Sequence, residues 1–274
     1  MCAALFQPFP MLPGRAAQVW RHQPAYQRPR HFHEEPELNA VLAGSARLGI
    51  GDRTLELGPG ELVVFEPGQD HVLLEASPDL ELVVAALRPA LAERARGESP
   101  SIHARKLLLA PRELTAVRER SLALGDVHDK TAVERAVVEL FVLLTTRGAT
   151  THASTRRAVG LVRAAPVVSA SEVARRLRRA PAALSRAFHR DLGLTLVEYR
   201  ARVRLMRFIA LVDDGAALGT AALDADFGSY AQCHRTFQRA LGCSPRDYFG
   251  GVRCSIDALT SAAEYDTGVH SDRS

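Results

Sequence analysis

The chain has 274 residues, enough for two domains of ordinary size, and its hydrophobic content of 47% is typical of a folded globular protein. No run of about 18 apolar residues occurs, which argues against a membrane span. The N-terminal segment has no basic region ahead of its apolar residues, so no signal peptide is expected. The four cysteines, at positions 2, 233, 243 and 254, follow no zinc or redox spacing, so we expect buried thiols in a reducing cytoplasm.

The formal net charge of +4 is distributed unevenly. Residues 150–254 contain 17 Arg and no Lys against 8 acidic residues, a net charge of +9. Residues 1–149 carry −2 and residues 255–274 carry −3. A positive charge gathered in one half of a chain favours contact with phosphate groups, and a solvated basic surface is the plainer alternative.

Short apolar segments separated by turn signals follow one another over residues 19–87. The segments are 37–42, 46–50, 54–57, 62–65, 72–74 and 80–86, and the turns include Gly51-Asp52, Gly58-Pro59-Gly60 and Pro67-Gly68. Many short strands at this spacing predict a β-sandwich or β-barrel.

Within these strands lies the pattern His31-x-His33-x-x-x-Glu37, followed later by Gly68-x-x-His71. The pattern resembles the two sequence motifs of the cupin β-barrel, and the resemblance implies that the three histidines and the glutamate hold a metal. Alternate residues of a strand point the same way, so His31 and His33 can converge, and imidazole with carboxylate suits Zn, Ni, Mn or Fe. The alternative is a polar lining without metal that binds an effector directly, together with Phe65.

Residues 88–110 read as a connection, and two helices are predicted at 111–124 and 130–147. The second helix carries one apolar stripe, made of Val133, Val137, Leu140, Phe141 and Leu144. The stripe packs either on the chain's own barrel or on a second copy of the chain. The small, polar residues 148–154 are expected to form a linker.

The second half of the chain contains a helical pattern that occurs twice. Residues 186–200 align with residues 235–249: Arg186 matches Arg235, Phe188 matches Phe237, Arg190 matches Arg239, Leu192-Gly193 matches Leu241-Gly242 and Tyr199 matches Tyr248. Each copy ends a helix at Gly and starts another at a capping residue, Thr195 or Ser244. A helix over 196–212, about 25 Å long, is expected to join the two units.

Each unit reads as a helix-turn-helix, in which a scaffold helix supports a recognition helix. In the second recognition helix, predicted over 230–240, Cys233, Phe237 and Leu241 form an apolar face. In the first, Leu184 and Phe188 face the core and Pro181 sits in the first turn. A helix with one packed face and one basic face suits the major groove of DNA.

The tandem units resemble the DNA-binding domain of AraC-type transcription regulators. Such regulators commonly carry a cupin-like sensor, so the two resemblances agree. Two departures are Asp226 before the turn aromatic Phe227, where the family usually has Gly, and Arg178-Arg179-Ala180 in the first turn. The resemblance implies DNA contact by Ala182, Ser185, Arg186 and Arg190 of the first unit, and by Tyr230, Ala231, Gln232, His234, Arg235 and Arg239 of the second.

We therefore predict an α+β protein of two domains. Residues 1–110 form the cupin-like effector domain, 111–147 a helical hairpin that serves dimerisation, 148–154 the linker, 155–254 the tandem helix-turn-helix domain and 255–274 a polar tail. The predicted function is that of a cytoplasmic, non-enzymatic regulator that binds double-stranded DNA, a small-molecule or metal effector, a second copy of itself and, as an activator, RNA polymerase. The alternatives are a metal-dependent cupin enzyme with a helical oligomerisation module, and a regulator without an effector.

Overall fold

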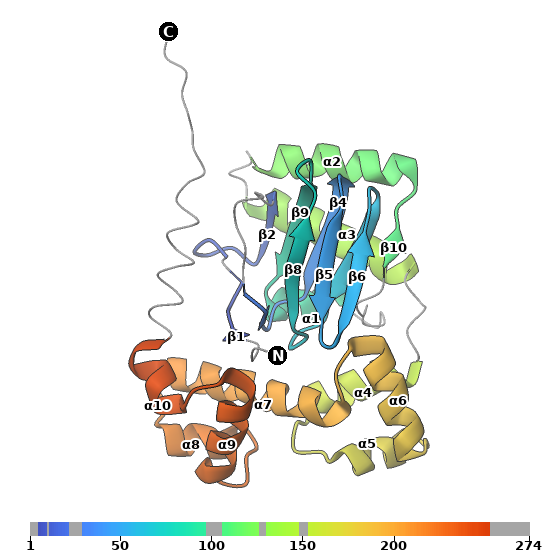
Figure 1. Cartoon of the computed structure of the whole chain (residues 1–274). Coiled ribbons are helices and arrows are strands. Elements are labelled where there is room, and N and C mark those ends of the chain that lie inside the picture. The colour runs from blue at the N-terminus through green and yellow to red at the C-terminus, as the bar shows by residue number, and fades with distance from the viewer. Residues whose placement is uncertain are drawn as a thin grey trace.

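The computed structural model describes residues 5–9, 11–21, 29–96, 106–125, 130–147 and 153–252. Its N-terminal half holds two five-stranded sheets, of order β1-β3-β8-β5-β6 and β10-β7-β4-β9-β2. The strands are β1 (Leu5–Phe6), β2 (Ala17–Arg21), β3 (His31–Phe32), β4 (Glu37–Ala43), β5 (Ala46–Ile50), β6 (Arg53–Leu57), β7 (Glu61–Phe65), β8 (His71–Ala76), β9 (Glu81–Leu87) and β10 (Leu107–Leu108). Nearly all described pairings are antiparallel, and the sheets form the predicted cupin-like barrel (Figure 1).

Strand β4 separates two apolar cores because successive side chains leave a strand on opposite faces. Leu38 and Leu42 belong to the core between the second sheet and its covering helices. Val41 belongs to the core inside the barrel, and Glu37 and Asn39 have the same parity. Strand β4 is thus buried on both faces. One face is apolar, and the other carries the polar side chains of Glu37 and Asn39.

Three helices accompany the barrel: α1 (Pro89–Arg96), α2 (Pro111–Gly125) and α3 (Lys130–Arg147). Val133, Val137 and Phe141 of α3 are buried in the core beneath the second sheet, and Leu140 packs against it. The chain's own barrel therefore covers this stripe, and a second copy of the chain would have to bind elsewhere. The side chain of Leu144 lies outside the described residues, as do most of the predicted linker and the whole predicted tail.

The described part of the C-terminal half, residues 153–252, is built of helices arranged around one core (Figure 1). They are α4 (Ala153–Ala164), α5 (Ala170–Arg176), α6 (Pro181–Leu192), α7 (Leu196–Asp213), α8 (Leu218–Asp224), α9 (Tyr230–Leu241), α10 (Pro245–Asp247) and the π-helical η1 (Tyr248–Val252). Helices α5–α6 and α8–α9 make the two helix-turn-helix units, and α7 joins them. Phe188, Tyr199, Phe208 and Phe237 are fully buried and anchor the helices to one another.

The predicted connection over 88–110 was wrong in part, because it contains α1 and β10. Pro89 reads as a breaker, but as the first residue of α1 its fixed φ suits helix initiation. Strands β1 and β3 were not predicted, since two residues carry no periodicity and only their pairing partners define them. In the described residues, no helix is long and apolar enough to cross a membrane.

Candidate DNA-reading surface and His–Glu site

Helix α9 is strongly amphipathic. Cys233, Phe237 and Leu241, four residues apart, are all buried, and burial raises the pKa of the Cys233 thiol to about 12. Ser229 caps the helix by accepting from the backbone N–H of Gln232, and Gly242 ends it in the left-handed region at φ 78°. Packing and caps therefore fix the helix and leave its opposite face outward.

The turn that precedes α9 is built around Asp226, which adopts φ 66°. Its carboxylate accepts from Arg207 Nη1 of α7 at 3.0 Å, so the residue that replaces the usual Gly also ties the turn to the joining helix. The next residue, Phe227, is buried, and the guanidinium of Arg204 lies 5.7 Å from its ring centroid. These contacts set the angle at which α9 leaves the turn.

The first unit follows the same plan with different residues. Arg178 takes the left-handed position, at φ 51°, between α5 and α6. Leu184 and Phe188 of α6 are buried as predicted, and Pro181 occupies the first turn. Gly193 ends α6 at φ 76°. The two units thus share left-handed glycine C-caps as well as the repeated sequence, although Ala180 at the start of α6 lacks the side-chain cap that Ser229 gives α9.

The residues predicted to contact DNA stand mostly on open surface. Ala182, Ser185, Arg186, Arg190, Ala231, Gln232, Arg235 and Arg239 are exposed, and Tyr230 and His234 are partly exposed. Gln232 has a structural contact as well, because its Oε1 accepts from the backbone N–H of Gly228 at 2.8 Å. The outward faces of α6 and α9 can therefore meet a duplex, with Arg and His as their main hydrogen-bonding groups.

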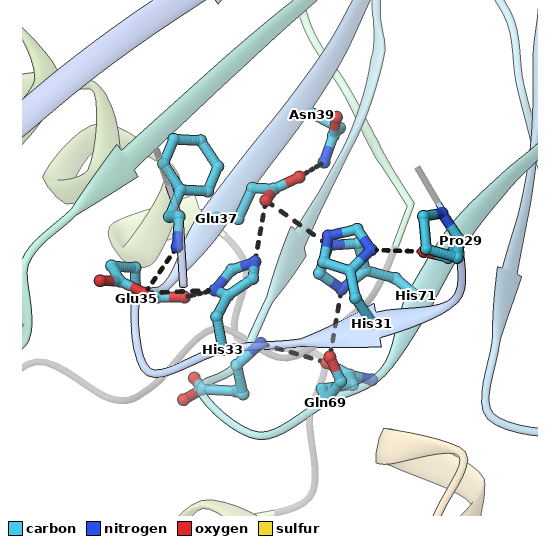
Figure 2. Close-up of polar contacts among 10 residues, drawn as sticks. Pro29, His31, His33, Glu35, Glu37, Asn39, Gln69 and His71 are labelled. Carbon is cyan, nitrogen blue, oxygen red and sulfur yellow. Dashed lines mark hydrogen bonds and ion pairs between the residues drawn. The ribbon is translucent and has the colours of Figure 1, made fainter. Parts of the chain in front are cut away.

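In the barrel, the four predicted ligand residues converge. His31 (β3), His33 (after β3), Glu37 (β4) and His71 (β8) each offer one ligand atom, and these atoms lie within 4.8 Å of one another (Figure 2). All four side chains are buried. Three strands of the barrel, and the segment that follows β3, therefore assemble the group that the sequence spacing indicated.

Each imidazole of this His–Glu site is oriented through its Nδ1. The Nδ1 atoms of His31, His33 and His71 lie 2.8, 2.8 and 3.1 Å from the backbone oxygens of Pro29, Glu35 and Gln69 (Figure 2). In a neutral ring, a proton on Nδ1 satisfies the carbonyl and leaves Nε2 as an electron-pair donor. Backbone support of this kind fixes the tautomer and ring direction that metal-ligating histidines need.

Glu37 supplies the negative charge of the site. Burial favours its neutral form, but the electrostatic attraction of His71 and a hydrogen bond with His33 hold the pKa of this carboxyl well below its ordinary value. Its Oε2 lies 3.0 Å from Nε2 of His33, and its Oε1 accepts from the amide of Asn39 at 2.6 Å. The carboxylate is thus held in place on both sides.

His71 shows that the site has capacity for a further group. Its Nε2 is buried and has no hydrogen-bond partner within the described part of the chain, although Oε2 of Glu37 lies 3.5 Å away. The ring stacks on Phe65 with centroids 4.1 Å apart and planes 6° apart. Phe65 therefore serves as a wall behind His71. An electron-pair donor left open beside a carboxylate fits a cation.

The sequence of the chain matches two known families. Residues 17–162 match the family described as AraC-like ligand binding domain, and residues 173–250 match the helix-turn-helix domain family. The chain belongs to the AraC family. It is therefore a DNA-binding transcription regulator with a ligand-binding domain.

The chain is also similar to several solved structures, all at low sequence identity. ToxT from Vibrio cholerae O395 is 12% identical, with a TM-score of 0.47, over 86% of this chain and 97% of ToxT. The AraC-like transcriptional activator CuxR is 15% identical, with a TM-score of 0.31, over 71% of this chain and 74% of CuxR. The C-terminal domain of AraT from Geobacillus stearothermophilus is 20% identical, with a TM-score of 0.35, over 36% of this chain and 86% of the AraT domain. No curated protein matches the chain.

Sequence reasoning missed several groups that support the sites of this AraC-family chain. Asn39 could have been found, because it lies two residues after Glu37 and therefore on the same face of β4. Asp70 and Arg202 could not, since their side chains meet across 132 residues of sequence. Local patterns give a residue's face, but not its partner from another domain.

Proposed function

We propose that this AraC-family regulator reads DNA with α6 and α9 and is controlled by a divalent metal bound at the His–Glu site. The outward faces of the two helices and the net charge of +9 on residues 150–254 support the first part. The second part rests on one observation: three imidazoles whose Nδ1 atoms point to backbone oxygens surround one buried carboxylate.

The donor set fits a transition metal better than an alkaline-earth ion, because three of its four members are imidazoles. His31, His33, Glu37 and His71 would hold Zn, Ni, Mn or Fe. Once bound, the ion would supply a positive charge that joins three strands of the barrel. A small-molecule effector binding directly at these residues is the second candidate, favoured by the aromatic wall that Phe65 forms behind His71.

Thermal melting tests the metal. A metal that binds only the folded chain stabilises it by mass action, by about 2.7 kcal/mol at a hundredfold excess over Kd, or roughly 5–10 °C for a chain of this length. We expect Zn²⁺ to raise the Tm of the wild-type protein by this amount and EDTA to reverse the shift. The His33→Ala variant should show neither effect.

His234→Ala is the matched control, because it removes a histidine of α9 outside the His–Glu site and should keep the wild-type shift. Metal analysis of the purified protein gives the direct check. If no metal co-purifies and none of Zn, Ni, Mn or Fe moves the melting curve, the metal is rejected and the four residues are only a polar lining of the barrel.

We further propose that the protein acts as a homodimer and, when it activates transcription, contacts RNA polymerase. The family of the chain supports this proposal, whereas the buried position of the α3 stripe directs the dimer contact to another surface. Sedimentation equilibrium of the full chain tests the dimer, and a monomer at every concentration up to that of the DNA-binding assay contradicts it.

A further inference from the structure

The barrel contacts the first helix-turn-helix unit at the end of α6. Arg53 of β6 donates a hydrogen bond to the backbone oxygen of Arg190, and Gln69 Nε2 donates to the backbone oxygen of Leu192 at 2.8 Å. The last carbonyls of a helix lack partners within it and carry partial negative charge, so donors from the barrel satisfy them. The sensor half thus holds the C-terminal end of α6 without covering its exposed DNA-reading residues.

The barrel also contacts the second unit. Phe6 of β1 belongs to the apolar core of the helical half, and the hydroxyl of Tyr248 donates to the backbone oxygen of Phe6 at 3.4 Å. Helix α7 runs between these two contacts, below the barrel (Figure 1). The barrel is therefore positioned to brace both units at once.

Asp70 connects the two halves at this interface. Its Oδ2 accepts from Arg30 of the barrel at 2.8 Å, and its Oδ1 accepts from Arg202 of α7 at 2.5 Å. Its side chain is only 5% exposed. Arg202 also donates to the backbone oxygen of Gly68 at 3.0 Å and lies 5.1 Å from the ring centroid of Phe32. One buried carboxylate thus joins a guanidinium from each half.

The same two segments carry both the His–Glu site and the interface. Around β3, His31 and His33 point into the site, whereas Phe32 between them packs in the core of the helical half. Before β8, the backbone oxygen of Gln69 orients His71, and the side-chain amide of Gln69 donates to the last turn of α6. Asp70 stands between these two residues. A shift of either segment on ligand binding must therefore move residues that contact the DNA-binding half.

We propose that Asp70 is a positioning residue that couples the His–Glu site to DNA binding, a role that rests on the proposed function of that site. Its two ion pairs fix the segment before His71 against α7. A change at the site then reaches both helix-turn-helix units through the barrel. Breaking a buried charge pair by removing one partner is strongly unfavourable, so the contact holds the halves in one arrangement.

The test is the ratio of duplex Kd values measured in EDTA and in Zn²⁺, for the full chain on one selected DNA sequence. Coupling between two sites typically changes affinity about 5- to 150-fold, so the wild-type ratio should differ from 1 by at least about fivefold. In Asp70→Asn the ratio should fall within about twofold of 1. Zn²⁺ should still raise the Tm of this variant, because its four ligand residues are unchanged.

Two further variants guard the interpretation. Glu75→Gln is the matched control: it makes the same carboxylate-to-amide change at an exposed residue of β8 that pairs with Arg47 of the neighbouring strand β5, and it should keep the wild-type ratio. Arg202→Gln removes the same contact from the α7 side, so its Kd ratio should also fall within about twofold of 1. This variant keeps the proposal testable if Asp70→Asn fails to fold.

The outcomes separate this proposal from the one on which it rests. A wild-type ratio of 1 with a normal Zn²⁺ melting shift, or a wild-type ratio retained by folded Asp70→Asn or by Arg202→Gln, overturns the coupling and leaves the metal site standing. A wild-type protein whose melting Zn²⁺ does not shift contradicts the metal site and the coupling together.

Discussion

Two residues with side chains occupy backbone conformations that usually require Gly. Arg178 and Asp226 have φ of 51° and 66° and stand at equivalent points of the two turns. The left-handed region costs an L-residue about 1–2 kcal/mol, and less for Asp, whose short side chain bonds locally. Asp226 is compensated by its ion pair with Arg207. Both residues therefore keep the turn geometry that Gly would give, but the conformational strain costs less free energy at Asp226 than at Arg178.

Arg178→Gly should stabilise the protein. Glycine removes the steric cost of the left-handed conformation but adds freedom to the unfolded chain, so we expect a net gain of about 0.5–1 kcal/mol in the free energy of unfolding. Asp226→Gly should gain less, because it also removes the contact with Arg207. Denaturant unfolding of the full-length variants measures both. Loss of stability in Arg178→Gly, or a larger gain in Asp226→Gly, would show that strain does not govern these turns.

At the scale of elements, α7 is the part that sets the geometry of DNA binding. Its first turn is fixed by a capping box, in which Thr195 and Glu198 each accept from the other's backbone N–H. The helix has 18 residues, which at 1.5 Å each is about 27 Å. The two units stand at its opposite ends (Figure 1). Because successive major grooves lie about 34 Å apart, the units can enter neighbouring grooves on one face of the duplex.

Footprinting of the full chain should therefore show two protected patches about 10 bp apart per protomer. Arg186→Ala should weaken protection in one patch and Arg235→Ala in the other, since the two exposed arginines occupy equivalent positions of α6 and α9. We expect the exposed Arg239, near the end of α9, to contact phosphate rather than a base, so Arg239→Ala should weaken binding to any sequence equally. A single patch, or the loss of the same patch in both Arg186→Ala and Arg235→Ala, would rule out this arrangement.

Local patterns in the sequence predicted most of this architecture, but they could not predict contacts between segments far apart in the chain. The spacing His31-x-His33-x-x-x-Glu37 predicted the His–Glu site because a strand and the turn after it place these residues side by side. Gly193 and Gly242 predicted the C-terminal ends of two helices, because left-handed helix caps favour Gly. The α3 stripe showed an apolar face but not what covers it. Likewise, nothing near Asp70 indicates that its partner is Arg202, because that contact exists only once both halves have folded.

The whole molecule is a sensor barrel held against two DNA-reading units. Where the two halves meet, backbone approaches backbone: a Cβ added to Gly193 would lie 3.0 Å from the oxygen of Ile50, and one added to Gly51 would overlap the oxygen of Gly193. Side chains larger than hydrogen would force the halves apart at this point. Close contact, buried charge and a shared core together make the domain arrangement specific, so ligand state and DNA binding can influence each other.

The central claim is that this arrangement serves sequence-specific DNA binding, and one titration tests it most directly. The full chain should be titrated, over a range of salt concentrations, with a duplex selected from a random pool and with a scrambled duplex of equal length. We expect the selected duplex to bind at least about a thousandfold more tightly. With six to eight phosphates contacted, log affinity should fall against log salt with a slope of roughly −5 to −7. Equal affinity for both duplexes, or an affinity that salt does not change, would contradict the account.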